Sequence, residues 1–260
     1  MIEDDALPKS DPVAVTGDLS DLRRFTPARI AIGRAGPGQP TSASLRFSLD
    51  RARARDAVHA TIDFEALGQS LRARGWSVAR VQSAARDRAE YIRRPDLGRR
   101  LSADGSEALE GEARGCDIAI VAADGLSAFA IEINLLAVLG HLRPLLLDRR
   151  LSVGPLVLVE HGRVAIGDEI GERLDAKLVI VLIGERPGLS AADSLGAYVT
   201  WRPRIGTMDS SRNCISNIRP SGLSPEAAAA QIADLVARAF LQGATGVRLE
   251  GAGPGALPKS

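Results

Sequence analysis

The run Leu178-Val179-Ile180-Val181-Leu182-Ile183 consists of six consecutive aliphatic residues without a polar side chain. A short run of this kind predicts a strand that is buried on both faces of a sheet, as the strands of parallel sheets are. Similar runs occupy residues 118–122 and 156–159, and a weaker one occupies residues 78–83. The sequence therefore predicts a sheet with doubly buried central strands.

Helical patterns separate these runs. Helices are predicted around residues 128–139 and 168–174, and the clearest one follows Ser224, a capping residue with Pro225 directly after it. Gly243 is predicted to end this last helix. Strands that alternate with helices are typical of an α/β protein. We predict a Rossmann-like, mostly parallel, doubly wound sheet.

The first part of the chain is predicted to be helical. Thr41 and Asp63 are suited to cap two helices, and Gly75 to end the second. We therefore predict a small helical N-terminal domain or arm over residues 19–95 and a Rossmann-like domain over residues 96–249. Residues 1–18 and 250–260 have no periodic apolar pattern and are predicted to be flexible tails.

Composition and charge exclude several classes of function. The 260 residues are 45% hydrophobic but only 3% aromatic, so the core must consist of aliphatic side chains and alanine. The 33 basic and 32 acidic residues nearly cancel, which gives no electrostatic reason to expect nucleic acid or an acidic membrane as a partner. No segment is seen to approach the ~18 apolar residues of a membrane span, and no signal-peptide pattern is present. We expect neither membrane insertion nor export.

Cysteine and histidine usage indicates a reducing compartment and no zinc or iron site. The two cysteines, Cys116 and Cys214, are too few for a disulfide framework and fit a reducing cytosol. The three histidines, His59, His141 and His161, are far apart in the sequence and have no cysteine or histidine at metal-ligand spacing. A zinc or iron site is therefore not expected.

Three polar blocks, two of them punctuated by glycine, are attached to predicted strands or helices in the second half of the chain. They are Gly162-Arg163-Val164 with Gly167-Asp168-Glu169-Ile170-Gly171, Leu182-Ile183-Gly184-Glu185-Arg186-Pro187-Gly188, and Arg212-Asn213-Cys214-Ile215-Ser216-Asn217-Ile218. Ligands of open α/β sheets bind beyond the carboxyl ends of the strands. We therefore expect Asp124-Gly125, residues 160–164 and residues 184–188 to form one binding rim.

Glu185 is the first candidate for ligand contact. Gly184 before it allows close backbone approach, and Pro187 after it restrains the turn, so the carboxylate is presented at a fixed place. By pattern alone, contact with a ligand and an ion pair with Arg186 or within the loop are equally open.

Val164 and Cys214 are the other two candidates. Taken alone, Val164 would be an ordinary core residue and Cys214 a small buried hydrophobe. The neighbours of Cys214 are unusually polar, but a nucleophilic role would need a base, and no histidine is near it in the sequence.

The order and the amino-acid sequences of these blocks resemble those of the small (light) subunit of ethanolamine ammonia-lyase, an adenosylcobalamin enzyme. The resemblance extends to further motifs and leaves out only the two tails. These motifs are Leu22-Arg23-Arg24-Phe25-Thr26-Pro27-Ala28-Arg29-Ile30, Gly33-Arg34-Ala35-Gly36, Tyr91-Ile92-Arg93-Arg94-Pro95-Asp96-Leu97-Gly98-Arg99-Arg100, Asp124-Gly125-Leu126-Ser127 and Ser194-Leu195-Gly196-Ala197-Tyr198. Several separated motifs in one order are far more specific than a single short pattern.

The resemblance implies that Val164, Glu185 and Cys214 contact adenosylcobalamin, held between this chain and the large subunit. Substrate binding and radical chemistry are then expected on the large subunit, with no catalytic residue and no metal ligand on this chain. None of the histidines lies in an Asp-x-His-x-x-Gly motif, which replaces the cofactor's benzimidazole in many cobalamin proteins, so the cofactor is expected to keep its own base. The implied reaction converts ethanolamine to acetaldehyde and ammonia, in the cytoplasm or inside a bacterial microcompartment.

Two other functions remain open. A nucleotide-binding oxidoreductase would suit the fold, but no Gly-x-Gly-x-x-Gly motif opens a helix after a predicted strand. A non-catalytic cobalamin-binding scaffold would also suit the chain. A large co-purifying partner favours the lyase, bound nicotinamide favours the oxidoreductase, and neither favours the scaffold.

Overall fold

The computed structural model describes residues 22, 24–25 and 28–250. The described residues divide into two units between Leu49 and Asp50, within helix α1 (Thr41–His59). Thr41, the predicted cap, is itself the first residue of the helix, and the apolar side chains of Leu45 and Leu49 are exposed. The predicted tails, residues 1–18 and 250–260, lie outside the described residues except for Glu250.

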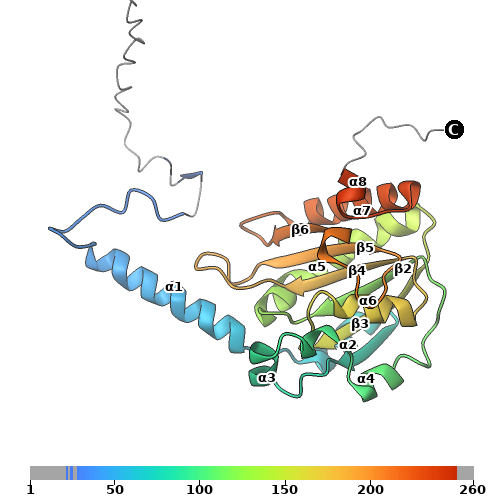
Figure 1. Cartoon of the computed structure of the whole chain (residues 1–260). Helices are drawn as coiled ribbons and strands as arrows, with labels where there is room; N and C mark the ends of the chain where they lie inside the picture. Colours follow the sequence, from blue (N-terminus) through green and yellow to red (C-terminus); the bar gives the residue numbers. More distant parts are fainter. Residues whose placement is uncertain (1–21, 23, 26–27, 251–260) are drawn as a thin grey trace, which may run out of the picture. The chain divides into compact units, whose positions relative to one another are not determined.

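The second unit is built on one six-stranded sheet with the order β1-β3-β2-β4-β5-β6 (Figure 1). The strands are β1 (Val78–Gln82), β2 (Ile118–Ala123), β3 (Val153–Glu160), β4 (Leu178–Gly184), β5 (Leu195–Trp201) and β6 (Arg212–Ile218). The first four run parallel, whereas β5 and β6 pair in antiparallel fashion. The predicted α/β class with a mostly parallel sheet is confirmed, although its order differs from the 3-2-1-4-5-6 order of the dinucleotide-binding sheet.

Helices cover both faces of this sheet. They are α2 (Phe64–Ala73), α3 (Arg88–Arg93), α4 (Ala103–Glu107), α5 (Ala128–Asp148), α6 (Ile166–Arg173), α7 (Pro225–Gln242) and α8 (Val247–Glu250), with the 3-10 helices η2 (Leu97–Arg99) and η3 (Asp209–Ser211). Contacts place α2, α5 and α7 on one face and α4 and α6 on the other. Two of the three predicted caps are confirmed, since the Asp63 side chain accepts a hydrogen bond from Ala66 N and that of Ser224 from Ala227 N.

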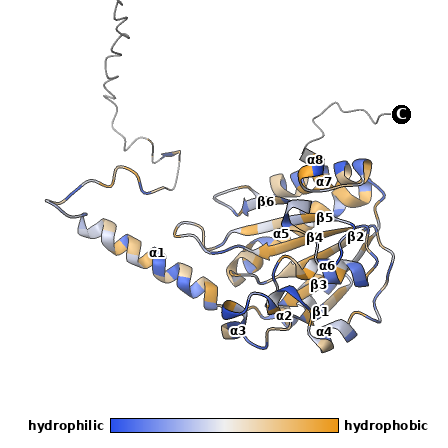
Figure 2. Ribbon diagram, viewed as in Figure 1, coloured by the Kyte–Doolittle hydropathy of each residue, from blue (hydrophilic) through white to orange (hydrophobic). Residues whose placement is uncertain are grey.

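The central strands are hydrophobic because each contributes to two cores (Figure 2). In β2, Ile118 and Ile120 pack into the core under α5 and α7, and Ala119 and Val121 pack into the core under α6. All six residues of β2 and all seven of β4 are buried. The doubly buried strands predicted from the aliphatic runs are therefore confirmed.

The sheet extends further than predicted at the β6 edge, whereas its β1 edge corresponds to the predicted run at residues 78–83. Strand β1 and helix α2 lie within residues 50–95, which were assigned to the helical N-terminal region, yet they belong to the compact unit that holds the sheet. Strands β5 and β6 were not predicted, and the block that begins at Arg212 is itself a strand. Its polar residues are tolerated because β6 is an edge strand, in which three of seven residues are exposed.

Helix α5 corrects one expectation. Its 21 residues, with a mean hydropathy of 1.5 in the most apolar window, meet the length and composition of a membrane span, which no segment was expected to approach. Nine of its residues are buried, and the helix packs against β4 and α7, so its apolarity serves the core. The helix also continues past Leu139, its predicted end, through Gly140 to Asp148.

Candidate functional site

The carboxyl ends of β2, β3 and β4 meet at one edge of the sheet because these strands are parallel. A cleft of about 420 Å³ lies there, and its lining includes Gly125 after β2, Val164 after β3 and Glu185 after β4. Strands β3 and β4 lie on opposite sides of β2. The connections from β2 and β3 therefore lead to opposite sides, and the cleft lies at this switch point of the sheet. This is the position at which open α/β sheets bind ligands.

A second cleft of about 280 Å³ adjoins the first. Arg163, Val164 and Tyr198 line both clefts, whereas Cys214 lines only the second. The structure thus brings the three sequence-predicted residues to one continuous surface: Glu185 in the first cleft, Cys214 in the second and Val164 in the wall between them.

Glu185 is held by the strands beside it. Its backbone N–H donates to the Ser194 carbonyl at 2.9 Å, and its Oε2 accepts hydrogen bonds from Ser194 Oγ at 2.5 Å and from Asn217 N at 3.2 Å. Among the ion pairs between described residues, none involves Glu185 or Arg186. The carboxylate is therefore fixed by neutral hydrogen bonds at the edge of the first cleft, and the ion-pair alternative is not realised within the described chain.

Val164 lies in the short connection between β3 and α6. It is half-buried, packs against the core beneath α6 and lines both clefts. The residue is thus a core residue on one side, as its type suggests, and a wall of the candidate site on the other.

Cys214 is paired with Tyr198 across the β5–β6 ladder. Cys214 is an exposed residue of β6 rather than a buried hydrophobe, but partial desolvation raises the pKa of its thiol above the ordinary value; the contact with Tyr198 lowers this pKa, and the nearby Glu185 charge raises it. Burial also raises the pKa of Tyr198. Both groups are therefore protonated at neutral pH and suit contact with a ligand rather than nucleophilic attack.

Three residues that line the clefts were not singled out from the sequence, although each lies in a quoted motif. Tyr91 comes from α3, Arg163 precedes Val164, and Tyr198 comes from β5. Nothing in the local pattern distinguishes them from surface or core residues. Their shared position depends on contacts between segments that are distant in the sequence.

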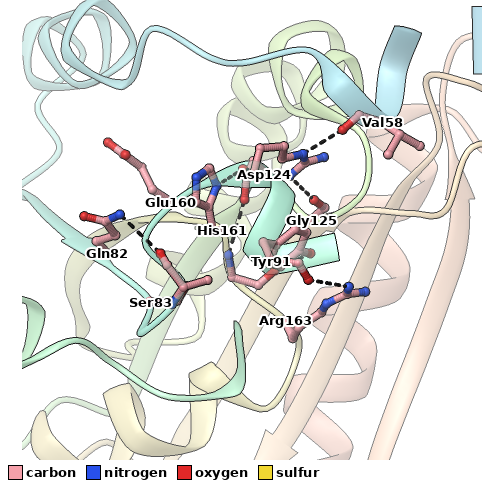
Figure 3. Close-up of polar contacts among 12 residues, drawn as sticks. Val58, Gln82, Ser83, Tyr91, Asp124, Gly125, Glu160, His161 and Arg163 are labelled. Atoms are coloured by element: carbon pink, nitrogen blue, oxygen red, sulfur yellow. Dashed lines mark hydrogen bonds and ion pairs between the residues drawn. The ribbon is translucent and has the colours of Figure 1, made fainter. Parts of the chain in front are cut away.

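A buried polar network supports the loop after β3. Asp124, which is 4% exposed, lies 3.2 Å from His161 Nδ1 and accepts a hydrogen bond from Gly162 N at 3.3 Å. The Tyr91 hydroxyl donates to the Gly162 carbonyl at 3.0 Å. Figure 3 shows these side chains converging on the loop from β2, β3 and α3. The loop that carries Val164 is thereby held in one conformation.

The chain was compared with known proteins. The family model of the ethanolamine ammonia-lyase light chain (EutC) matches residues 17–250. The chain belongs to this family. Proteins named ethanolamine ammonia-lyase small subunit are similar to it along most of their length. That of Bradyrhizobium diazoefficiens is 50% identical over 243 residues, covering 93% of each chain. That of Azotobacter vinelandii is 49% identical over 255 residues, covering 93% of this chain and 94% of its own.

A third relative, from Xanthomonas campestris pv. campestris strain B100, is 50% identical over 233 residues and covers 88% of this chain and 86% of its own. Membership of the ethanolamine ammonia-lyase light chain family identifies the chain as a subunit of a lyase. A small subunit implies a larger partner subunit.

Proposed function

We propose that this chain covers one side of adenosylcobalamin in ethanolamine ammonia-lyase and that the two adjoining clefts form its half of the cofactor site. The observation that carries the proposal is the convergence of Val164, Glu185 and Cys214, which come from separate elements of the fold, on one surface. In this sense the domain is Rossmann-like, because it uses the carboxyl ends of parallel strands for a ligand.

The surface suits a broad macrocycle whose edge carries amide groups. Val164 and Ile183 offer apolar contact, whereas Glu185, Arg163 and Tyr198 offer hydrogen-bonding groups. Cofactor sites usually bury most of the ligand surface, but neither cleft here is an enclosed cavity. A second protein surface is needed to enclose the cofactor, and we propose that the ethanolamine ammonia-lyase large subunit supplies it.

Adenosylcobalamin supplies the radical chemistry that converts ethanolamine to acetaldehyde and ammonia. The residues of this chain position and shield the cofactor. The fixed Glu185 carboxylate accepts hydrogen bonds, Val164 packs against the macrocycle edge, and Cys214 and Tyr198 close the far end of the surface. We propose that substrate binding and proton transfer reside on the large subunit. We propose that the assembly lies in the cytoplasm, either free or inside a bacterial microcompartment.

The cofactor should keep its own benzimidazole on cobalt. Among the described residues, no histidine lines either cleft, and His161 is engaged with Asp124. Electron paramagnetic resonance of the cobalt(II) form in ¹⁵N-labelled protein tests this. Superhyperfine coupling that follows the protein label would contradict base retention.

Co-expression with the large subunit, followed by an ammonia assay with ethanolamine and adenosylcobalamin, tests the proposed function. The chain alone should release no ammonia and bind cobalamin weakly, and activity should appear with the large subunit. Ammonia release by the chain alone would contradict the assignment of substrate binding and catalysis to the large subunit. Bound nicotinamide without activity would favour an oxidoreductase, and cobalamin binding without a large partner would favour a scaffold.

A further inference from the structure

Arg163 is a cation whose charge is not paired within the described chain. Its guanidinium carries five N–H donors, of which Nη2 donates to the Tyr91 carbonyl at 3.3 Å. Its Nε is buried and has no acceptor. Among the ion pairs of residues 22, 24–25 and 28–250, none includes Arg163. A half-buried guanidinium with so few acceptors is costly unless another oxygen completes it.

The guanidinium is nevertheless held in a defined place. Its central carbon lies 4.3 Å from the centre of the buried Tyr91 ring, and the Arg163 backbone N–H donates to the Gly98 carbonyl at 2.7 Å. Figure 3 shows the Arg163 side chain in contact with Tyr91. Because the backbone and the aromatic ring both restrain it, the cation needs little ordering on binding.

Asp124, the buried carboxylate of the network beside Tyr91, is already paired with another arginine. Arg88 lies over the Tyr91 ring at 4.9 Å, and its Nη1 pairs with Asp124 at 3.1 Å. The side chain of Asp124 also contacts His161 and Gly162 N. Arg88 and Arg163 therefore both contact the Tyr91 ring. The Asp124 carboxylate pairs with Arg88, which lines neither cleft.

We infer that Arg163 is a further ligand-binding residue, which donates hydrogen bonds to an oxygen acceptor of the bound cofactor from the wall between the two clefts. This inference rests on the proposed function. The acceptor is an amide carbonyl of the corrin edge or a phosphate oxygen of the nucleotide loop. A planar guanidinium suits both, because it presents several donors in fixed directions.

The test compares cobalamin affinity in the enzyme assembled with its large subunit. Arg163→Met keeps an apolar stem over Tyr91 but removes all five donors, so the Kd for adenosylcobalamin should rise about 10- to 100-fold. Arg163→Lys keeps the charge and loses the planar fork, and its Kd should lie between those of the parent and the Met variant. Arg93→Met is the matched control, because Arg93 is an exposed arginine of α3 outside both clefts, and it should bind like the parent.

Cobinamide, which lacks the nucleotide loop and its phosphate, identifies the acceptor. A loss that persists with cobinamide assigns Arg163 to a corrin amide, and a loss that disappears assigns it to the phosphate. A purely structural role would weaken both ligands while lowering the melting temperature of the assembly, and that result would overturn the inference. Unchanged affinity of Arg163→Met for cobalamin would also overturn the inference. In either case, cobalamin binding by the parent protein would leave the proposed function intact. A parent that binds no cobalamin would overturn both.

Discussion

The parallel half of the sheet and its antiparallel edge contribute to the candidate site in different ways. Strands β1, β3, β2 and β4 are mainly structural supports, and their contribution to the site comes from the last residues of β4 and from the segments after their carboxyl ends. In β5 and β6 the strands themselves face the site, through Tyr198 and Cys214. The comparison teaches that a mostly parallel sheet can gain a side wall from an antiparallel edge whose strands need not be apolar on both faces.

Besides the β4–β5 ladder, a buried ion pair connects the two halves. Asp168 of α6 accepts two hydrogen bonds from Arg212 of β6, at 2.6 and 2.7 Å, and both side chains are at most 3% exposed. Asp168→Leu removes the only buried carboxylate that Arg212 contacts among the described residues and leaves its buried charge with the exposed Asp209 alone, so the free energy of unfolding should fall by about 3–5 kcal/mol. Denaturant titration measures it.

The double variant Asp168→Leu with Arg212→Met should recover much of this loss, since no buried charge remains. Asp209→Asn is the control, because the Asp209 side chain is 94% exposed and its pair with Arg212 should contribute little. A loss in Asp168→Leu no greater than in Asp209→Asn would show that this pair does not join the halves.

Close backbone packing at the carboxyl edge should be the next most sensitive feature. A Cβ added at Gly184 would overlap the backbone oxygens of Ser127 and Asp124. Gly184→Ala should therefore destabilise the protein by about 3 kcal/mol, the upper end of the usual cost of overpacking. Gly140→Ala is the control: it meets no atom within 4 Å and should stabilise α5 by about 0.5–1 kcal/mol. Thermal unfolding compares the two, and equal melting temperatures would contradict the prediction.

Glu185 tests the junction of the two halves, since it follows β4 and accepts hydrogen bonds from Ser194 and Asn217. Glu185→Gln retains the shape and an amide oxygen that can accept from them, but it removes the charge. The Kd for adenosylcobalamin in the assembled enzyme should rise by about one to two decades, equivalent to about 1.5–3 kcal/mol. The Michaelis constant for ethanolamine should hardly change. Normal assembly with unchanged cofactor affinity would make Glu185 a structural turn residue only.

The smallest expected effect concerns the Cys214 thiol. Because its pKa is raised, the thiolate is scarcer at pH 8 than in an unperturbed cysteine, and alkylation by iodoacetamide should be slow and should accelerate as the pH rises further. Glu185→Gln removes one cause of the raised pKa and should speed the reaction at a given pH. Mass spectrometry in a Cys116→Ser background measures the rates. Rates like those of a free thiol, unchanged by Glu185→Gln, would contradict this electrostatic link.

Local signals predicted a large part of the fold. The aliphatic runs identified β2, β3 and β4, and the capping residues Asp63 and Ser224 identified the beginnings of α2 and α7. These predictions succeeded because burial on both faces demands apolar residues throughout a strand, and because a cap satisfies backbone groups within three residues. The alternation of these elements also indicated which strand ends would form the rim.

Val164, Glu185 and Cys214 became candidates through family resemblance, since pattern alone left each of them ambiguous. Only the tertiary structure placed them on two adjoining clefts and turned the polar block from Arg212 into an edge strand. It also joined Arg163 to Tyr91, 72 residues away in the sequence. Contacts of this kind depend on side-chain and backbone partners that the folded sheet brings together, and no short-range periodicity encodes such partners.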